Sequence, residues 1–578
     1  MTGPTAPKDP EKARPFFYIL KDKDIFGERQ KDGTGIQFIY ESDGRLINSA
    51  QITGNVTDKE ELTLLETVEG FGRLVHSIGV SVETDRPKET AEFVFQMYGK
   101  KDLYGGGTNL TTSLKCDGME HRIYLSDYRW TEDDHVPGQI KILFAAPERM
   151  GKVSVRLFLN DGYEAPPEEE DLVIDMHSEE YCGMISRSLL QLGNPYRIRK
   201  AIEKSKAGKE VTLAYIGGSI TQGAGAIPIH TECYAYKSFQ LFQNRFSTQN
   251  NVRFIKAGVG GTPSELGMIR FDRDVLREGE RPDIVVIEFA VNDEGDETKG
   301  VCYESLVRKV LKLPWNPAVV LLFSVFANDW NLQDRLSPVG RLYDLPMVSI
   351  KDTVVEQFTK KSNEGRVLTK NQFFYDMFHP SNLGHTIMAD CMQYLFERCD
   401  AAEPARVGTF VEGMTEEQIL SEKLFGPAVI GADFERIFLL DKKNRYVGAK
   451  IRAGSFTSTD IELQSVEMDG NLTQTPEFPY NWMYDGSRPQ MPGFEMEITC
   501  KSLFLIFKDS GETDVGKANV FVNDVYCMTA DPHKNNWLHC NAVLLFWETE
   551  SRSHKVRIAV TEEDRNKKFT ILGFGYTI

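Results

Sequence analysis

The chain has 578 residues, too many for a single hydrophobic core, and this length predicts about three domains. Hydrophobic residues make up 41% and charged residues 26%, a composition typical of soluble globular proteins. The formal net charge is -18 and no cluster of basic residues interrupts it, so we expect neither nucleic acid nor an anionic membrane surface as a partner. No apolar run approaches the roughly 18 residues of a membrane span.

The start of the chain and its cysteines bear on location and metal binding. Residues 1–13 lack the apolar segment of a signal peptide and predict a disordered leader. The nine cysteines are scattered between Cys116 and Cys540 without a Cys-x-x-Cys pair, so we expect no metal site. Reduced thiols and a cytoplasmic location are the simplest interpretation. A secreted protein that had lost its signal would have the same sequence.

Residues 14–182 predict an all-β domain, most simply a β-sandwich. Short segments rich in β-branched and aromatic residues are separated by glycine, asparagine and aspartate. The expected strands include residues 16–20, 35–40, 92–98, 121–125 and 153–159. Prolines and acidic residues at 166–171 then predict a linker, because this composition resists packing.

Residues 183–402 have the pattern of an α/β domain. Nearly continuous apolar strands alternate with amphipathic segments, which predicts a parallel sheet covered by helices on both faces. The expected strands are residues 211–216, 252–257, 283–289, 318–325 and 347–350, and the clearest helices are 234–246 and 303–313. In such a sheet, a ligand site is expected at the carboxyl ends of the strands.

Residues 403–578 return to a β pattern. The boundary is predicted by the Ala-Ala-Glu-Pro-Ala stretch at 401–405, followed by a charged helical segment at 415–423. The expected strands are residues 436–440, 503–507, 518–522, 542–547, 555–560 and 569–576. We find no convincing internal repeat.

The first candidate functional residue is Ser219, in the Gly-Gly-Ser-Ile-Thr segment after the first central strand. Glycines at a strand end permit a tight turn, and a helix opening there would aim backbone N–H groups at an anionic transition state. A serine nucleophile also needs a base and oxyanion donors. Taken alone, the segment fits an ordinary strand–helix turn equally well, and it lacks the G-x-S-x-G spacing of a nucleophile elbow.

Two further segments follow strand ends. Gly261 closes a Gly-Val-Gly-Gly run after the second strand, where the spacing of a dinucleotide-binding loop fails. Asn292 follows the third strand, and its side-chain N–H could stabilise an oxyanion. The alternative is that Asn292 is a capping or turn residue.

Asp376 and His379 supply the residue types that a serine nucleophile lacks. They lie three residues apart, so one loop could bring the carboxylate to the imidazole, fix its tautomer and leave the other nitrogen facing a serine. A histidine before proline is otherwise most often structural. His385, in the following helix, is the competing base, and we interpret it as structural or supporting.

These segments, in this order, resemble the SGNH hydrolase superfamily, the GDSL esterases, over residues 185–400. The resemblance implies a flavodoxin-like, three-layer αβα central domain and assigns the four consensus residues to Ser219, Gly261, Asn292 and His379. It assigns the triad aspartate to Asp376. The sequence departs from the family pattern in two places, with Gly218 in place of a customary aspartate and Lys256 in place of a customary asparagine.

The glycine-rich segments and flanking β domains look most like bacterial carbohydrate esterases of this superfamily. That narrower resemblance implies removal of O-acetyl groups from xylan or mannan through an acyl-enzyme on Ser219. The oxyanion donors would be the N–H groups of Ser219 and Gly261 and the Asn292 side chain. No cofactor or metal is implied. The flanking domains would be jelly-roll or carbohydrate-binding-like β-sandwiches, and the partner an acetylated oligosaccharide or polysaccharide.

Three aromatic residues are candidate sugar contacts, because flat apolar rings stack on sugar C–H surfaces. They are Trp330, Tyr480 and Trp482, although core or loop packing explains each equally simply. Two other functions are compatible with the sequence: a lipid or thioester acylhydrolase, and a non-catalytic carbohydrate-binding protein. The oligomeric state is left open, a dimer included.

Overall fold

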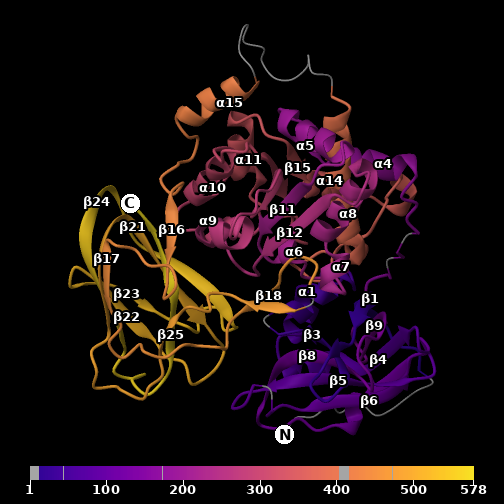
Figure 1. The fold of residues 1–578 in the computed structure, drawn as a ribbon. Helices are drawn as coiled ribbons and strands as arrows, with labels where there is room; N and C mark the ends of the chain where they lie inside the picture. Colours follow the sequence, from indigo (N-terminus) through magenta and orange to yellow (C-terminus); the bar gives the residue numbers. More distant parts are fainter. Residues whose placement is uncertain are drawn as a thin grey trace.

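In a computed structural model of the chain, two β domains flank a central α/β domain (Figure 1). The structure describes residues 12–42, 44–103, 105–168, 170–171, 173–402, 416–471 and 473–578. Most of the predicted leader, and the start of the predicted C-terminal region at 403–415, therefore lie outside the described residues. Within the described ranges, no helix combines the length and apolarity that crossing a bilayer requires.

The N-terminal domain consists of two antiparallel sheets around one core, which confirms the predicted β architecture of this flank. One sheet has the order β1 (Phe16–Phe26), β9 (Met150–Leu159), β4 (Val75–Thr84), β7 (His121–Tyr124). The other has the order β2 (Glu28–Arg29), β3 (Gly35–Tyr40), β8 (Asp134–Phe144), β5 (Thr90–Gly99), β6 (Asn109–Lys115). Alternate residues of β9, such as Val153 and Val155, are buried between the sheets, as expected of a half-buried strand. Three short helices between β3 and β4 close this core: α1 (Arg45–Ile52), α2 (Lys59–Leu64) and α3 (Val68–Leu74).

The central sheet confirms the predicted flavodoxin-like fold. Its order is β10 (Leu189–Gln191), β15 (Met347–Ser349), β14 (Ala318–Phe323), β13 (Ile284–Glu288), β11 (Val211–Gly217), β12 (Val252–Gly258). All neighbours pair in parallel except β10, which runs antiparallel at the edge. Counted from β11, the parallel strands follow the order 2-1-3-4-5. The strand order reverses between the first and third strands, β11 and β13, and ligands of such folds bind at this point.

Helices cover both faces of this sheet, as the apolar strands require. Leu213 and Tyr215 of β11 belong to one apolar cluster, whereas Ala214 and Ile216 belong to the other. The first cluster includes α4 (Glu179–Ser186), α5 (Tyr196–Lys206), α8 (Tyr234–Phe246), α12 (Ile350–Thr359) and α14 (Asn382–Asp400). The second includes α9 (Ser264–Phe271), α10 (Val301–Leu311) and α11 (Gln333–Leu342).

The C-terminal domain is built on a bent antiparallel sheet. Its main path is β16 (Ile437–Leu440), β25 (Phe569–Thr577), β21 (Phe494–Asp509), β24 (His539–Val560), β22 (Ala518–Val522), β23 (Val525–Ala530), with β17 (Ala449–Arg452) and β20 (Trp482–Tyr484) attached. The long strands β21 and β24 pair along their length with register shifts between Cys500 and Phe504. Buried residues on both sides of these shifts share one core, so the sheet curves around it. A hairpin, β18 (Ser465–Glu467) and β19 (Gln474–Pro476), extends from this domain toward α6 (Ser219–Gln222) and α7 (Ile229–Glu232) (Figure 1).

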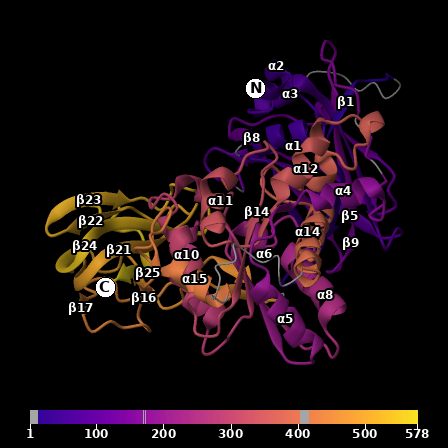
Figure 2. The same cartoon turned by 90° about the horizontal axis from the view of Figure 1, so that it is seen from above.

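The other face of the C-terminal sheet is buried against the central domain. Along β21, Leu503 and Leu505 face the domain's own core, whereas Phe504 and Ile506 join the apolar cluster of the central sheet. Figure 2 shows the resulting position of the C-terminal sheet beside α10 and α15 (Glu416–Phe425). The two domains therefore share a hydrophobic core.

The N-terminal domain meets the central domain through polar contacts and through Ile52 of α1, which packs against the central core. Lys23 on β1 is buried, and its Nζ donates to the backbone carbonyls of Asn371 (2.8 Å) and Phe374 (2.5 Å). The predicted linker is anchored at the same place, because Asp171 accepts hydrogen bonds from Thr369 (2.6 Å) and Asn371 (2.8 Å). These contacts connect the N-terminal domain to the segment that leads into Asp376 and His379.

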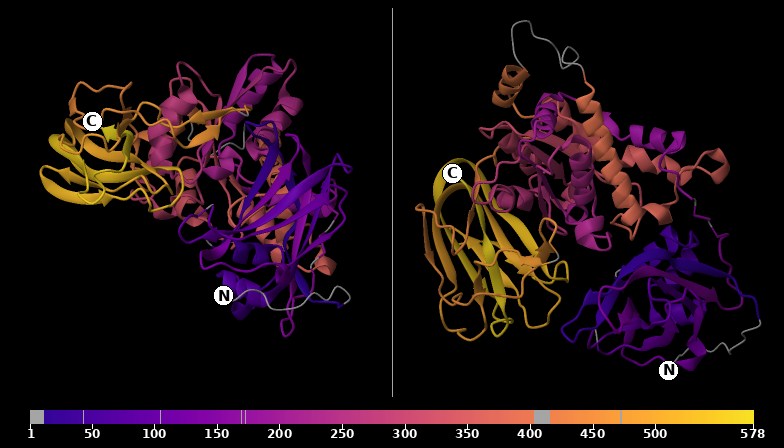
Figure 3. Two further views of the ribbon diagram at one scale, coloured as in Figure 1. Left: turned by 90° about the horizontal axis from the view of Figure 1, so that it is seen from below. Right: turned by 45° about the vertical axis from the view of Figure 1, so that its right-hand side comes forward.

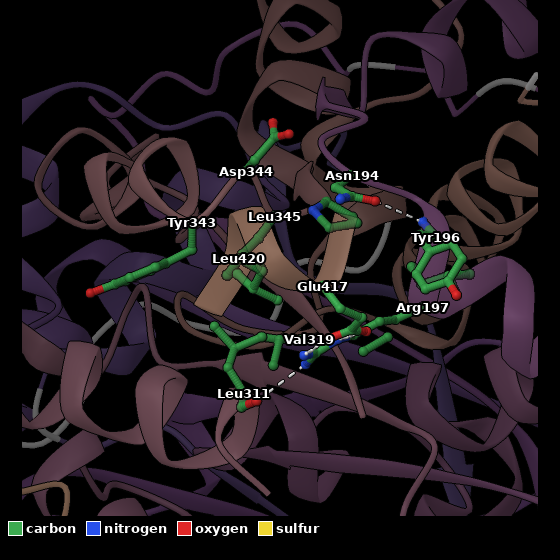
Figure 4. A pocket seen from close by; sticks show the side chains of 13 residues that line it. Asn194, Tyr196, Arg197, Leu311, Val319, Tyr343, Asp344, Leu345, Glu417 and Leu420 are labelled. Atoms are coloured by element: carbon green, nitrogen blue, oxygen red, sulfur yellow. Dashed lines mark hydrogen bonds and ion pairs between the residues drawn. The ribbon is translucent and has the colours of Figure 1, made fainter. Parts of the chain in front are cut away.

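A small cavity lies at the amino ends of β14 and β15, beneath α15 (Figure 4). Arg197 and Glu417 form an ion pair there (2.8 Å), and Arg197 also donates to the backbone carbonyl of Leu311 (3.2 Å). This arrangement fixes α15 to the central domain. The cavity is at the edge of the sheet opposite the carboxyl strand ends, where the candidate residues gather.

Candidate active site

The turn between β11 and α6 (Ser219–Gln222) presents Ser219 at the carboxyl end of the sheet. Gly218, which replaces the aspartate customary in the resembled family, connects strand and helix. A Cβ atom on Gly218 would lie 2.1 Å from Oδ1 of Asn292, so a side chain at this position would displace the Asn292 amide. The turn and the β13 end are thus fitted to one another, and Ser219 remains partly exposed.

Ser219, His379 and Asp376 form a continuous hydrogen-bonded chain. The Nε2 atom of His379 lies 3.0 Å from Oγ of Ser219, and its Nδ1 lies 2.9 Å from Oδ2 of Asp376. The other carboxylate oxygen, Oδ1, accepts from the backbone N–H groups of Phe378 (2.8 Å) and His379 (2.9 Å). A carboxylate at Nδ1 makes that nitrogen the donor and leaves the Nε2 lone pair for the serine hydroxyl.

The surroundings of Asp376 favour its ionised form. Burial acts to raise the pKa, but the adjacent His379 and the N–H donor of Phe378 more than compensate, so the pKa of Asp376 is below its ordinary value. The side chains of His379 and Asp376 are 19% and 25% exposed, which leaves the dyad open to a substrate from one side. Chemically, the arrangement can accept a proton from Ser219 and hold the resulting imidazolium.

Gly261 and Asn292 lie beside Ser219, as the predicted sheet order requires. Gly261 follows β12 and has a φ of 71°, a left-handed conformation that favours glycine. The neighbouring Gly260 is close to the nucleophile, because a Cβ atom there would lie 3.8 Å from Cβ of Ser219. Asn292 follows β13 with its side chain against Gly218, and its amide forms no hydrogen bond with any residue in the described ranges. Its amide group is thus available to a ligand.

His385 is excluded as the base by its partners. It is fully buried, its Nδ1 accepts from the backbone N–H of Tyr234 (3.2 Å), and its Nε2 donates to the carbonyl of Ala224 (3.1 Å). Burial lowers the pKa of His385 to about 3, so the ring is neutral and both nitrogens are occupied. His385 therefore supports the loop after α6.

Two buried cations support the nucleophile turn. Arg270 on α9 donates to the carbonyls of Gly217 (2.8 Å) and Ala257 (2.7 Å), which joins the ends of β11 and β12. Lys256, in place of the customary asparagine, donates to the carbonyl of Gln222 at the end of α6 (2.8 Å). Sequence reasoning missed Arg270, because an arginine in an amphipathic helix ordinarily indicates a solvated face.

The three predicted sugar-binding aromatics have separate positions. Trp482 is only 5% exposed and packs between Phe494 and Phe574 in the C-terminal core, so its predicted role as a sugar platform is wrong. Tyr480 is exposed but borders a hollow that contains none of the candidate catalytic residues. Trp330 is near the site. It stacks on Phe326, which contacts Phe378 beside His379; the three ring pairs in this series have centroid distances of 5.7, 5.1 and 6.2 Å.

Trp537 is an aromatic residue of the site that sequence reasoning missed. It is 45% exposed, in a polar loop before β24, and a Cβ atom on Gly261 would lie 2.8 Å from its ring. It lines a groove of about 690 Å³ whose other lining residues include Tyr40 and Arg45 of the N-terminal domain. The right-hand view of Figure 3 shows the two β domains next to one another on the same side of the central domain. The same two residues line a smaller hollow beside Asp376. The only available signal was a tryptophan preceded by two asparagines, which are typical of exposed loops.

Comparison with known proteins relates this site to one family. Residues 215–387 match the GDSL-like Lipase/Acylhydrolase family. The match includes all five residues that the resemblance assigned: Ser219, Gly261, Asn292, Asp376 and His379. No curated protein matches the chain.

Solved structures provide a likeness of fold. Two crystal structures of a two-domain esterase (CEX) active on acetylated mannans, one co-crystallized with mannopentaose, match with TM-scores of 0.53 and 0.52. Each is 23% identical and covers 68% of this chain and 98% of that chain. A catalytic mutant of Axe2, an acetylxylan esterase from Geobacillus stearothermophilus, is 18% identical over 34% of this chain and 96% of that chain, with a TM-score of only 0.25.

Proposed function

From the match of the central domain to the GDSL-like Lipase/Acylhydrolase family, we propose that this protein is a serine esterase that removes O-acetyl groups from hemicellulose oligosaccharides or polysaccharides such as xylan or mannan. The observation that carries the proposal is the hydrogen-bonded chain from Ser219 through His379 to Asp376. The substrate class is supported by the groove that both β domains line, because its Trp537 lies against Gly261 and its Tyr40 and Arg45 also line the hollow beside Asp376.

In the first half of the proposed reaction, Nε2 of His379 takes the proton of Ser219 as Oγ attacks the ester carbonyl carbon. The carbonyl π electrons move to oxygen, and the N–H groups of Ser219 and Gly261 and the amide of Asn292 stabilise the oxyanion. Asp376 stabilises the imidazolium. When the tetrahedral intermediate collapses, the bond to the sugar oxygen breaks, and His379 donates its proton to that oxygen.

In the second half, a water molecule replaces the sugar. His379 takes a proton from the water as its oxygen attacks the acyl carbon of the acetyl-enzyme, and the same donors stabilise the second oxyanion. Collapse then breaks the bond to Ser219 Oγ, which recovers its proton from His379. The products are acetate and the deacetylated sugar, and the groups of this chain return to their starting state.

The groove fits a sugar polymer better than a lipid. Its walls combine exposed aromatic rings, Tyr40 and Trp537, with polar side chains that include Asn535, Asn536 and Arg45. Sugar rings have apolar C–H faces and hydroxyl edges, so they need this mixture of flat apolar surface and hydrogen-bonding groups. A long acyl chain would instead need a continuous apolar lining.

The decisive experiment is mass spectrometry of acetylated xylo- and manno-oligosaccharides before and after incubation with the protein. We expect losses of acetyl groups that depend on Ser219. Ser219→Ala should abolish the release while the thermal unfolding temperature stays unchanged, because loss of a triad member typically costs about 10⁴-fold or more. Thr221→Ser, a conservative change beside it, is the matched control.

Other outcomes would contradict the proposal. Near-normal activity of Ser219→Ala would exclude the acyl-enzyme. A preference for long chains in a series of p-nitrophenyl esters would favour a lipid acylhydrolase, and turnover of acyl thioesters alone would favour a thioesterase. Binding of oligosaccharides without any release of acetate would indicate a non-catalytic carbohydrate-binding protein.

A further inference from the structure

The loop that bears Gly261 is held by side chains of the C-terminal domain. Gln464, directly before β18, donates from Nε2 to the carbonyl of Gly260 (2.9 Å). His539, the first residue of β24, has its Nε2 3.0 Å from the carbonyl of Gly261. Both side chains are more than nine-tenths buried. Two consecutive carbonyls of a central-domain loop are therefore bound by another domain.

The bond from Gln464 acts on the same peptide unit that contains the Gly261 N–H. The Gly260–Gly261 bond is trans, so the planar amide points its carbonyl and its N–H in opposite directions. Fixing the Gly260 carbonyl against the C-terminal domain therefore aims the Gly261 N–H away from that domain. Gly260 itself lies close to Ser219, because a Cβ atom built on it would be 3.8 Å from Cβ of Ser219, so this peptide unit adjoins the candidate nucleophile.

The remaining polar groups of the loop are already paired. The N–H of Gly260 donates to Oε1 of Gln222 (3.0 Å), and the two carbonyls bind Gln464 and His539. The Gly261 N–H forms no hydrogen bond with any group that the structure describes. The loop thus keeps one backbone donor free.

Each of the two C-terminal side chains is itself held in orientation. Oε1 of Gln464 accepts from the backbone N–H of Cys540 (2.9 Å), which sets the direction of the amide. A carbonyl can only accept, so Nε2 of His539 must carry a hydrogen. Its Nδ1 lies 3.3 Å from Nδ2 of Asn535 and 3.4 Å from Oδ2 of Asp509. These partners fix the ring plane.

We infer that Gln464 and His539 are positioning residues that hold the Gly261 N–H as an oxyanion donor, so that the C-terminal domain completes the catalytic site rather than only binding substrate. The inference rests on the proposed esterase function. Neither side chain touches the reacting atoms, and their effect passes through two peptide units. An oxyanion donor in a fixed position costs no reorganisation during the reaction, whereas a mobile one does.

The test compares two variants with matched controls in the full-length protein. Gln464→Glu keeps the size of the side chain and the bond from Cys540 but replaces the donor with an acceptor. We expect kcat on p-nitrophenyl acetate to fall about 100-fold, near the cost of losing one oxyanion donor, with KM changed less than threefold. His539→Ala should lower kcat roughly tenfold, and His539→Gln, which restores an N–H donor, should recover most of it.

The controls separate positioning from folding. Gln474→Ala alters an exposed glutamine of the hairpin formed by β18 and β19. His533→Ala removes a histidine that lies in the same loop as Trp537 and contacts the Val515 carbonyl (3.2 Å). Both should retain normal kcat. A trifluoromethyl ketone forms an adduct with the serine that carries an oxyanion. Its inhibition of Gln464→Glu and of His539→Ala should weaken by the same factor as kcat/KM. A merely structural role would change the unfolding temperature without this proportionality.

The outcomes distinguish this inference from the proposed function. If the wild-type protein hydrolyses acetyl esters through Ser219 but Gln464→Glu and His539→Ala keep kcat within twofold, only the positioning role is overturned. If the control variants lose as much activity as Gln464→Glu and His539→Ala, or if only KM changes, the positioning role is overturned as well. A wild-type protein that hydrolyses no ester overturns both.

Discussion

The two β domains of this protein hold opposite halves of the same site. The N-terminal domain contacts the segment that carries Asp376 and His379, through Lys23 and Asp171. The C-terminal domain contacts the loop that carries Gly261, through Gln464 and His539. In the proposed mechanism, one domain thus supports the residues that move protons, and the other supports a residue that stabilises charge on oxygen.

The two attachments also differ in physical kind. The C-terminal sheet buries Phe504 and Ile506 in the apolar core of the central domain, whereas the N-terminal contacts described above are mainly hydrogen bonds, with the partly buried Ile52 beside them and a separate core behind. Apolar burial is non-directional and large, and polar contacts are directional and individually small. We therefore expect the C-terminal attachment to dominate stability and the N-terminal attachment to adjust the site.

Phe504→Ala should produce the largest effect on stability. The ring is fully buried between the two domains and contacts Phe434 at a centroid distance of 5.4 Å. Removing it should lower the free energy of unfolding by about 3–5 kcal/mol in urea denaturation. Phe438→Ala, at an exposed position of β16, should cost less than about 1 kcal/mol. Equal losses would mean that the shared core contributes little.

Glu41 lines the hollow beside Asp376 where the N-terminal domain meets the central domain, and Glu41→Gln should reveal a pH dependence of stability there. Burial raises the pKa of Glu41 to about 8, above its ordinary value, even though Ser49 donates to the carboxylate (3.1 Å). A raised folded pKa means that the fold favours the protonated acid, so this stabilisation is complete below about pH 4 and is lost as the pH rises toward 8. Relative to wild type, the variant should gain about 2–4 kcal/mol between pH 4 and 8.

Urea unfolding at both pH values measures this difference. Glu92→Gln, on the exposed face of β5, is the control and should show the same pH dependence as the wild-type protein. If Glu41→Gln also follows the wild-type curve, then Glu41 ionises without cost and the N-terminal contact is not sensitive to pH.

Lys23→Met should test whether the N-terminal domain affects catalysis as well as stability. It leaves the carbonyls of Asn371 and Phe374 without their donor, which should cost about 1–3 kcal/mol. Because these carbonyls precede the Asp376–His379 loop, kcat should fall several-fold while ester binding is unchanged. Steady-state kinetics on p-nitrophenyl acetate would measure it, with the exposed Lys31→Met as the control. An unchanged kcat would limit Lys23 to a structural role.

Trp537→Ala should have the smallest effect, confined to substrate binding. We expect KM for an acetylated oligosaccharide to rise about tenfold, equivalent to roughly 1.4 kcal/mol, with kinetics on p-nitrophenyl acetate unaltered. Tyr480→Ala alters an equally exposed ring in a different hollow and should leave both substrates unaffected. If the two variants behave alike, the groove beside Trp537 does not bind the sugar chain.

The sequence was sufficient for the central domain because its signals are local. The apolar strand before Ser219 and the three-residue spacing of Asp376 and His379 are both contained in short segments. Sheet topology then brings such segments together at one edge. The support from Gln464 and His539 could not be predicted, because it depends on how a separate domain docks. The prediction for Trp482 was wrong for a related reason. Its aromatic neighbours suggested an exposed loop, but Trp482 begins the short strand β20, which packs inside the core.

The hydrogen bonds between the C-terminal domain and the Gly260–Gly261 loop have a consequence for how such proteins can be recombined. A sugar-binding module attached by a simple tether can be exchanged between enzymes without altering chemistry. Here a graft that lacked Gln464 and His539 would leave two buried carbonyls unpaired beside the nucleophile. The central domain and its C-terminal neighbour should therefore be kept together, and chimaeras should be cut on the N-terminal side.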